Sequence, residues 1–532
     1  KQTSFLKKKN IRIIKLNSLL TKDDFLKLFR KLFQLGKRRI LIESGLIFLN
    51  QLLKMNYVNN LYIFKSNTKL RSNGFNNSKK NLIKNLKKIS GKSEISLFTN
   101  QIEINPHTWD SEDGPDNFII EQSQPISNEA IELMDEFVGK NKMIERFSEV
   151  MRGSLANFTE NKSVSHFLYK ELASDSFKIY QAKQDGYPFY EDIEIMQTKS
   201  SEIRKSFKRI FFIGIGGSNL APSLLYDVFK KKNDIEVIFL TGSDPAEYLS
   251  YEIQKDDGFV LVSKSFSTVE TLQIFENFIG NSYLDRVFAI TANPDRAFKL
   301  GIPKDNVINF DSSTNGRFSI WSPVGIILPL LGMNFYAFLE GGHSMDAICL
   351  NEKNNNPALR LSMQDIFHNN VLDNETSLIL NYDYQLRNFY TYAQQIEMES
   401  NGKSMNSSGK SVDFQTGPIV WGGYGPRTQH SFFQHIFEGT KDSNNYLICS
   451  RGNSEEKALN IHQFEAQIES LTSKGINTTT ITMNELDSFS VGALMSLWEN
   501  KTIFNSFFWD INAFDQPGVE LGKINTKKRL GH

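Results

Sequence analysis

Two segments of the chain combine small polar residues with a preceding apolar run in a way that suits phosphate binding. The first is IGIGGSNLAP at residues 213–222, in which three glycines precede Ser218 and a predicted helix. At such a turn the backbone amides, including that of Gly217, can approach an anion closely, and the helix N-terminus favours negative charge. The spacing is not that of a Walker loop and fits the dinucleotide fingerprint poorly. A bound dinucleotide, or a tight strand-to-helix connection without a ligand, stays an alternative interpretation.

The second segment, VSKSFSTVET at residues 262–271, gathers short hydroxyl side chains around one lysine. Neutral donors and a single cation suit a phosphate monoester, whose oxygens accept several hydrogen bonds. The candidate ligands are Ser263, Lys264, Ser265 and Thr268. The same residues could cap the next helix, which is compatible with anion binding because both roles use the free amides of the first turn. Both segments follow predicted strands, and α/β folds bind ligands at the carboxyl ends of their strands.

Length and composition limit the classes of protein to which the chain can belong. Its 532 residues, 40% of them hydrophobic, supply material for two or three domains. With 61 Lys and Arg against 60 Asp and Glu, the net charge of +1 gives no overall attraction to nucleic acid or to an anionic membrane. The two cysteines, Cys349 and Cys449, have no metal-type spacing, so we expect no metal site and a reducing, cytoplasmic location. A small-molecule partner fits this composition best.

Strand-like apolar runs alternate with helical patterns through most of the chain. A first set of strands is predicted within residues 208–229, 234–242, 258–265 and 286–292. Downstream, TSLILNYD, GPIVWGG, NNYLICS and INTTTITMN supply a second set. Such alternation predicts an α/β protein with two doubly wound parallel sheets flanked by helices. The apolar stretch SPVGIILPLLGM is shorter than the roughly 20 residues that span a bilayer, and it is predicted to be a buried helix.

Several longer motifs carry a resemblance to a known family. They are NFTENKSVSHF, NGRFSIWSPVG, QQIEMESNGK, GPIVWGGYGPRTQHSFFQHIFEGT and WDINAFDQPGVELGK, in that order from residue 157. With the two loops above, they resemble the glucose-6-phosphate isomerases over about residues 157–523. The resemblance implies an enzyme without cofactor or metal, built on two sugar-isomerase (SIS) domains, that interconverts glucose 6-phosphate and fructose 6-phosphate through a cis-enediolate. It also implies a sugar phosphate as partner and a homodimer.

The resemblance assigns the proton-transfer step to particular residues. Glu399 in MESNGK matches the carboxylate base, and Arg317 in NGRFSIW matches the cation that stabilises the enediolate. Gln395, one turn before Glu399 if the segment is helical, and Gln516 match substrate contacts. Outside these motifs, a glutamate in a polar segment is usually solvated, and an arginine more often belongs to a structural ion pair.

Ring opening is assigned in the same way. His430 and Lys523 match the groups that open the sugar ring, and Glu270 matches a glutamate that orients the histidine. A lone histidine is more often structural than catalytic. Where the family commonly has Gly-Thr-Asn-Gly, residues 425–428 read GPRT. This change removes positions that tolerate positive φ, so we expect another path for the loop that carries His430.

The sequence predicts five parts. Residues 1–105 form an α/β fragment whose RRILIESGLIFLNQLLK resembles the C-terminal part of the riboflavin-biosynthesis reductase domain, without the rest of that family's cofactor site. A polar linker follows at 106–127. The first SIS domain is expected at 128–330, the second at 331–510, and a C-terminal active-site segment at 511–532.

Two other functions stay open. One is a sugar-phosphate-binding regulator that keeps the SIS fold without turnover. The other is a dual glucose/mannose phosphate isomerase, against which Gln516 argues because those enzymes tend to carry a smaller hydroxyl residue there.

Overall fold

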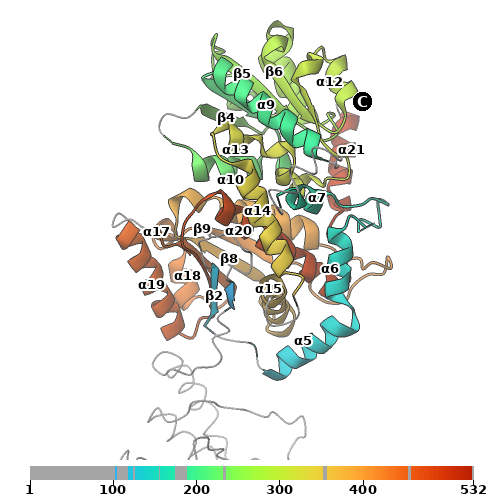
Figure 1. Ribbon diagram of the computed structural model, residues 1–532. Coiled ribbons are helices and arrows are strands. Elements are labelled where there is room, and N and C mark those ends of the chain that lie inside the picture. The colour runs from blue at the N-terminus through green and yellow to red at the C-terminus, as the bar shows by residue number, and fades with distance from the viewer. Residues whose placement is uncertain are drawn as a thin grey trace, which may run out of the picture. The chain divides into compact units, whose positions relative to one another are not determined.

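The computed structural model describes residues 102–104, 118–123, 126, 128–154, 156–173, 189–231, 235–351, 356–452 and 457–529. The predicted N-terminal fragment, with its reductase-like motif, lies outside these residues apart from 102–104. Two sheets, one of five strands and one of six, organise the described part (Figure 1). Both belong to one compact unit, residues 99–468 and 477–532.

The first sheet is wholly parallel, with strand order β4-β3-β5-β6-β7. Its strands are β3 (Arg209–Ile213), β4 (Glu236–Leu240), β5 (Asp257–Val262), β6 (Val287–Thr291) and β7 (Val307–Asn309). Every residue of β5 is buried, as expected of a parallel strand covered on both faces. The sequence predicted all of these strands except β7, which is too short to show a pattern. The chain changes winding direction between β3 and β5, which is the topological switch point of this sheet.

The second sheet has a parallel centre of the same kind. The strands β8 (Thr376–Asn381), β9 (Ile419–Tyr424), β10 (Asn444–Ser450) and β11 (Thr479–Met483) run in the order β11-β10-β8-β9. Two strands, β1 (Ile102–Ile104) and β2 (Phe118–Gln122), extend it antiparallel beyond β11. The fold class is therefore confirmed, with a mixed edge that was not predicted.

Strand β2 corrects the predicted linker. It falls inside residues 106–127, yet it pairs with β11 from Gln122 opposite Thr479 to Ile119 opposite Thr482. Phe118 and Ile120 alternate with less buried neighbours and point into the core. The polar residues around this short apolar run hid its alternation.

Helices cover the sheets. They are α5 (Asn128–Lys140), α6 (Met143–Met151), α7 (His166–Glu171), α9 (Tyr190–Ser206), α10 (Leu220–Phe229), α11 (Val269–Ile274), α12 (Pro294–Lys299), α13 (Ile327–Leu330), α14 (Phe335–Ile348), α15 (Pro357–Ile366), α16 (Phe389–Gln394), α17 (Gly425–Thr428), α18 (Phe433–Glu438), α19 (Ala458–Ser473), α20 (Ser488–Phe508) and α21 (Glu520–Arg529). The apolar stretch at 322–333 contains α13 and is buried, as predicted, as far as residue 331. Among the described helices, none is both long and apolar enough to cross a membrane.

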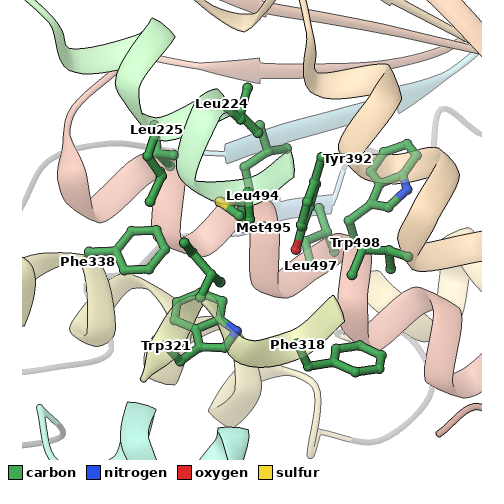
Figure 2. Close-up of a cluster of buried hydrophobic side chains, with 14 of the residues drawn as sticks. Leu224, Leu225, Phe318, Trp321, Phe338, Tyr392, Leu494, Met495, Leu497 and Trp498 are labelled. Atoms are coloured by element: carbon green, nitrogen blue, oxygen red, sulfur yellow. The ribbon is translucent and has the colours of Figure 1, made fainter. Parts of the chain in front are cut away.

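The core is centred on α20, which is buried along almost its whole length. Figure 2 shows side chains of α10, α14, α16 and the 3₁₀ helix η8 (Gly316–Trp321) gathered with those of α20. Burying each large apolar side chain contributes about 1.5–3 kcal/mol. In η8, the Trp321 ring stacks on Phe338 with centroids 4.6 Å apart, and Phe318 is also fully buried. These rings fix η8, the element that carries Arg317.

Candidate active site

The loops after β3 and β5 lie next to each other at the switch point of the first sheet. A Cβ atom placed on Gly214 would lie 3.1 Å from the carbonyl oxygen of Val262, so the two strand ends are in contact. Residues Gly216–Ser218 form a single 3₁₀ turn, η3, in which Gly216 has a φ of 59°. A Cβ atom on Gly217 would overlap the carbonyl oxygen of Gly316 in η8. Only glycine permits this approach of the two backbones.

The loop after β5 is built of hydroxyl groups, as the sequence predicted. The Oγ of Ser263 and the Oγ1 of Thr268 are 3.0 Å apart, and Ser267 donates to the Oγ of Ser265 at 2.9 Å. Lys264 between them is largely buried. Burial and the nearby cation of Lys162 lower the pKa of Lys264. An anion bound in this loop would offset that unfavourable environment.

Arg317 is buried and links η8, on which it lies, to Ser400 before β9 and to the C-terminal segment at residues 513–516. Its side chain is 1% exposed. Its Nε donates to the Oγ of Ser400 at 2.7 Å, and its Nη1 donates to the Oε1 of Gln516 at 2.9 Å. Its Nη2 donates to the carbonyl oxygens of Ala513 and Asp515. Four hydrogen bonds therefore hold the guanidinium plane in one orientation.

Glu399 faces this guanidinium. It ends a single π-helical turn, η13 (Gln395–Glu399), and its Oε1 lies 3.6 Å from Nη1 of Arg317. The carboxylate is 25% exposed, so it is accessible to a ligand. Gln395, at the other end of η13, places its Nε2 3.1 Å from where a Cβ of Gly216 would be. The two residues bracket one helical turn, as predicted, and their side chains join η13 to the glycine loop and to Arg317.

The structure thus brings together an anion-binding type of loop, a buried cation and an accessible carboxylate. A model of the family described as phosphoglucose isomerase matches residues 122–474 and 449–531. The chain belongs to the phosphoglucose isomerase family.

Individual relatives agree with this assignment. The glucose-6-phosphate isomerase of Legionella pneumophila (strain Paris) is 30% identical over 440 residues, which cover 75% of this chain and 86% of that protein. The glucose-6-phosphate isomerase of Wigglesworthia glossinidia brevipalpis is also 30% identical, with 76% and 84% covered. The crystal structure of a glucose-6-phosphate isomerase from Chlamydia trachomatis is 26% identical, with a TM-score of 0.69 over 78% of this chain and 88% of that one.

The residues predicted to open the ring, His430 and Lys523, are both exposed. Lys523 lies on α21 and forms an ion pair of 2.8 Å with Glu520. Within the described residues, no hydrogen bond or ion pair joins either side chain to Arg317 or Glu399. Glu270 lies in the first turn of α11, directly after the hydroxyl loop.

The altered loop before His430 is a helical turn. Residues 425–428 form α17 with Pro426 in its first turn, where the missing amide proton has no partner to lose. None of these residues has a positive φ. Gly425 is required for another reason, since a Cβ atom there would lie 2.6 Å from the ring of Tyr382.

Lys403 is a site residue that the sequence reasoning missed. Its Nζ donates to the carbonyl oxygens of Glu399 and Ser400 at 3.0 and 2.7 Å and lies 3.3 Å from Oδ1 of Asp515. Burial, followed by the charge of Arg317, lowers the pKa of Lys403 to about 8. The signal was present in MESNGK, because a lysine four residues after Glu399 can reach back to the last carbonyls of the helix.

A second missed feature is the support of the C-terminal segment. Thr159 donates to Oδ2 of Asp515 at 2.6 Å, and Asn157 donates through Nδ2 to the carbonyl oxygen of Phe514 at 3.2 Å. The NFTENK motif therefore holds the segment that Arg317 and Lys403 also bind. No cluster of three or more potential metal ligands occurs among the residues that the structure describes.

Proposed function

We propose that this chain is a glucose-6-phosphate isomerase, which interconverts glucose 6-phosphate and fructose 6-phosphate. The observation that carries the proposal is the accessible Glu399 carboxylate 3.6 Å from the fixed Arg317 guanidinium, beside the loops of residues 214–218 and 263–268. The loops bind the substrate phosphate through their amides and hydroxyls, and Lys264 adds one positive charge. The sugar chain then extends towards Glu399.

Proton transfer follows from this arrangement. Glu399 removes the proton from C2 of the open-chain aldose and returns it to C1, while the proton on the neighbouring oxygen moves between O2 and O1. The intermediate is a cis-enediolate. Negative charge develops on the sugar oxygens in the transition state that leads to this intermediate, whereas the substrate carries none there. The positive charge of Arg317 therefore stabilises the transition state more than the substrate and accelerates the step. Because protein groups already orient Arg317, little reorganisation is needed when the charge develops. Gln395 and Gln516 contact the substrate in this proposal.

Ring opening is the part that the cluster around Glu399 does not supply. We assign it to His430 and Lys523, with Glu270 orienting the histidine. The exposure of His430 and of the helix α21 fits a homodimer in which a second copy covers these surfaces. Sedimentation equilibrium that shows only monomers in the active enzyme would contradict the homodimer. We place the enzyme in the cytoplasm, where its sugar phosphate substrates occur.

The deciding experiment is Glu399→Gln. The amide keeps the shape of the side chain but removes the base, so kcat should fall on the order of 10²- to 10⁴-fold with little change in KM. Exchange of the substrate C2 hydrogen with solvent deuterium should slow in step. Glu202→Gln, a change of an exposed glutamate on α9, serves as the control and should have no effect.

Near-native turnover and exchange in the Glu399→Gln enzyme would overturn the assignment of the base. Binding of sugar phosphates without any turnover by the native chain would favour the regulator instead. Comparable turnover of mannose 6-phosphate would favour the dual isomerase.

A further inference from the structure

Glu397 lies midway between Gln395 and Glu399 in η13, and the proposed chemistry does not use it. Residues four apart share one face of a helix, and the residue midway between them lies on the opposite face. Gln395 and Glu399 meet the glycine loop and Arg317, whereas Glu397 is 1% exposed and faces the protein interior.

Glu397 is bound from the central helix α20. Nε1 of Trp498 donates to its Oε1 at 2.6 Å, and Nζ of Lys501 lies 3.1 Å from the same oxygen. Trp498 and Lys501 are three residues apart, so they lie on one face of α20 and grip the carboxylate together. Figure 2 shows Trp498 in the central core cluster. The grip therefore comes from an element that is itself fixed by packing.

The partner charges are fixed in turn. Nζ of Lys501 lies 2.7 Å from Oδ2 of Asp365 on α15, and that oxygen also accepts a hydrogen bond from Asn505 at 2.8 Å. The side chains of Lys501 and Asp365 have no exposed surface. Desolvating such charges is unfavourable, and apolar side chains of similar volume often stabilise a fold as well or better. What the ion pair adds over apolar packing is direction: it defines where one carboxylate of η13 must point.

We propose that Glu397 is a positioning residue which, through Trp498 and Lys501, fixes the rotation and depth of η13 so that Glu399 faces Arg317 and Gln395 faces Gly216. The inference rests on the proposed role of Glu399 as the base. A π-helical turn is wider than its α-helical neighbours and is used mostly as a single turn, often at functional sites. Without an anchor on its inner face, such a turn can relax towards α-helical geometry, which rotates both outer side chains.

The test uses Glu397→Gln and Trp498→Phe in the full chain. The amide keeps one acceptor for Trp498 but loses the ion pair with Lys501. Since a misplacement of about 1 Å can lower a rate roughly 10²-fold, we expect kcat per folded molecule to fall about 10- to 100-fold. KM should stay within about threefold, because the phosphate loops are untouched. Trp498→Phe keeps one aromatic ring in the core and removes the donor together with part of the indole, so we expect it to fold with a lower Tm and to lower kcat per folded molecule about three- to tenfold.

The matched control is Asp257→Asn. Asp257 is also buried, and it accepts hydrogen bonds from Nε and Nη2 of Arg209 at 2.9 and 2.7 Å. It is the first residue of β5, so it lies at the amino ends of the strands, and the proposed site lies at their carboxyl ends. This variant should lower Tm and leave kcat per folded molecule unchanged.

Two results would overturn the positioning role: kcat per folded molecule unchanged in Trp498→Phe and in any folded Glu397→Gln, or a rise in KM that accounts for the whole loss. These outcomes are distinct from failure of the proposed function. In that case the native chain would not isomerise the sugar phosphate, or Glu399→Gln would remain active.

Discussion

The two sheets have the same strand order around their switch points, but different residues lie at the strand ends there. In the first sheet, the ends of β3 and β5 carry a glycine loop and a row of hydroxyls, with Lys264 between them. In the second sheet, hydrogen bonds of the Asp383 carboxylate link the equivalent ends of β8 and β10. Asp383 accepts hydrogen bonds from the backbone amide and the Oγ of Ser450 at 2.6 and 2.8 Å and from Nζ of Lys457 at 2.8 Å.

The difference teaches that topology provides the crevice and side chains decide its use. A parallel sheet of this order has a gap at its switch point, because the following connections leave towards opposite faces. In the second sheet an internal carboxylate occupies the position that an external anion occupies in our proposal for the first. In our proposal, the chemistry of the second sheet lies instead in η13, the helical turn that follows α16 and carries Glu399.

The largest effect should come from removing hydroxyls of the first switch point. Ser263→Ala with Thr268→Ala removes two donors to the substrate phosphate, each worth roughly 1.5–3 kcal/mol when the acceptor is charged. KM should therefore rise roughly tenfold to a hundredfold for each bond lost, as measured by steady-state kinetics. Ser450→Ala, at the carboxyl end of β10 in the second sheet, should leave KM unchanged. Unaltered inhibition of the double variant by a phosphorylated sugar acid would contradict the phosphate assignment.

Much of this contrast was predictable from sequence, and the reasons for the rest are physical. Runs such as IFFI in β3 and FVLV in β5 are apolar because both faces of a parallel sheet are covered, so these central strands could be placed. The loops that follow them were found because such dense clusters of glycine or of serine and threonine are rare. In contrast, β2 is short and lies among polar residues, which concealed it.

The site was harder to predict where it depends on contacts distant in sequence. Gln516 and Arg317 are 199 positions apart, and only the family motifs indicated that both belong to one site. Nothing in sequence spacing shows that Lys501 reaches Glu397, because that contact depends on how α20 packs against η13. The ring-opening roles of His430 and Lys523 stay predictions, since their side chains are exposed in the single chain.

A second expected effect is a loss of folding stability at low pH through His368, which is hydrogen-bonded next to the second sheet. His368 is bound by Asn374 just before β8 and by Asn477 just before β11, both at 2.8 Å. Burial lowers the pKa of His368 to about 4 from an ordinary 6.5. The unfolded chain thus binds more protons between these values, and stability present above pH 6.5 is lost as the pH falls towards 4. The full loss is about 3 kcal/mol.

Chemical denaturation at a series of pH values measures this effect. His368→Asn should flatten the dependence of unfolding free energy on pH over that interval. His462→Asn, which replaces a histidine whose side chain is 75% exposed, should leave the slope as it is. An unchanged slope in His368→Asn would show that other groups, such as the buried His166, carry the acid sensitivity.

The smallest effect should come from the occupied switch point itself. In Asp383→Asn the carboxylate that accepts from Ser450 and Lys457 becomes an amide, and its new N–H₂ faces donors. The variant should lose roughly 1.5–3 kcal/mol of stability, measured as a lower midpoint of unfolding. KM should stay the same, because no part of this cluster contacts the loops of the first sheet in our proposal. Lys457→Met, which removes the 29% exposed partner but keeps the carboxylate bound to Ser450, should lose less. If Asp383→Asn raised KM as much as the loss of Ser263 and Thr268 does, both switch points would take part in substrate binding, and the division of labour between the two sheets would have to be abandoned.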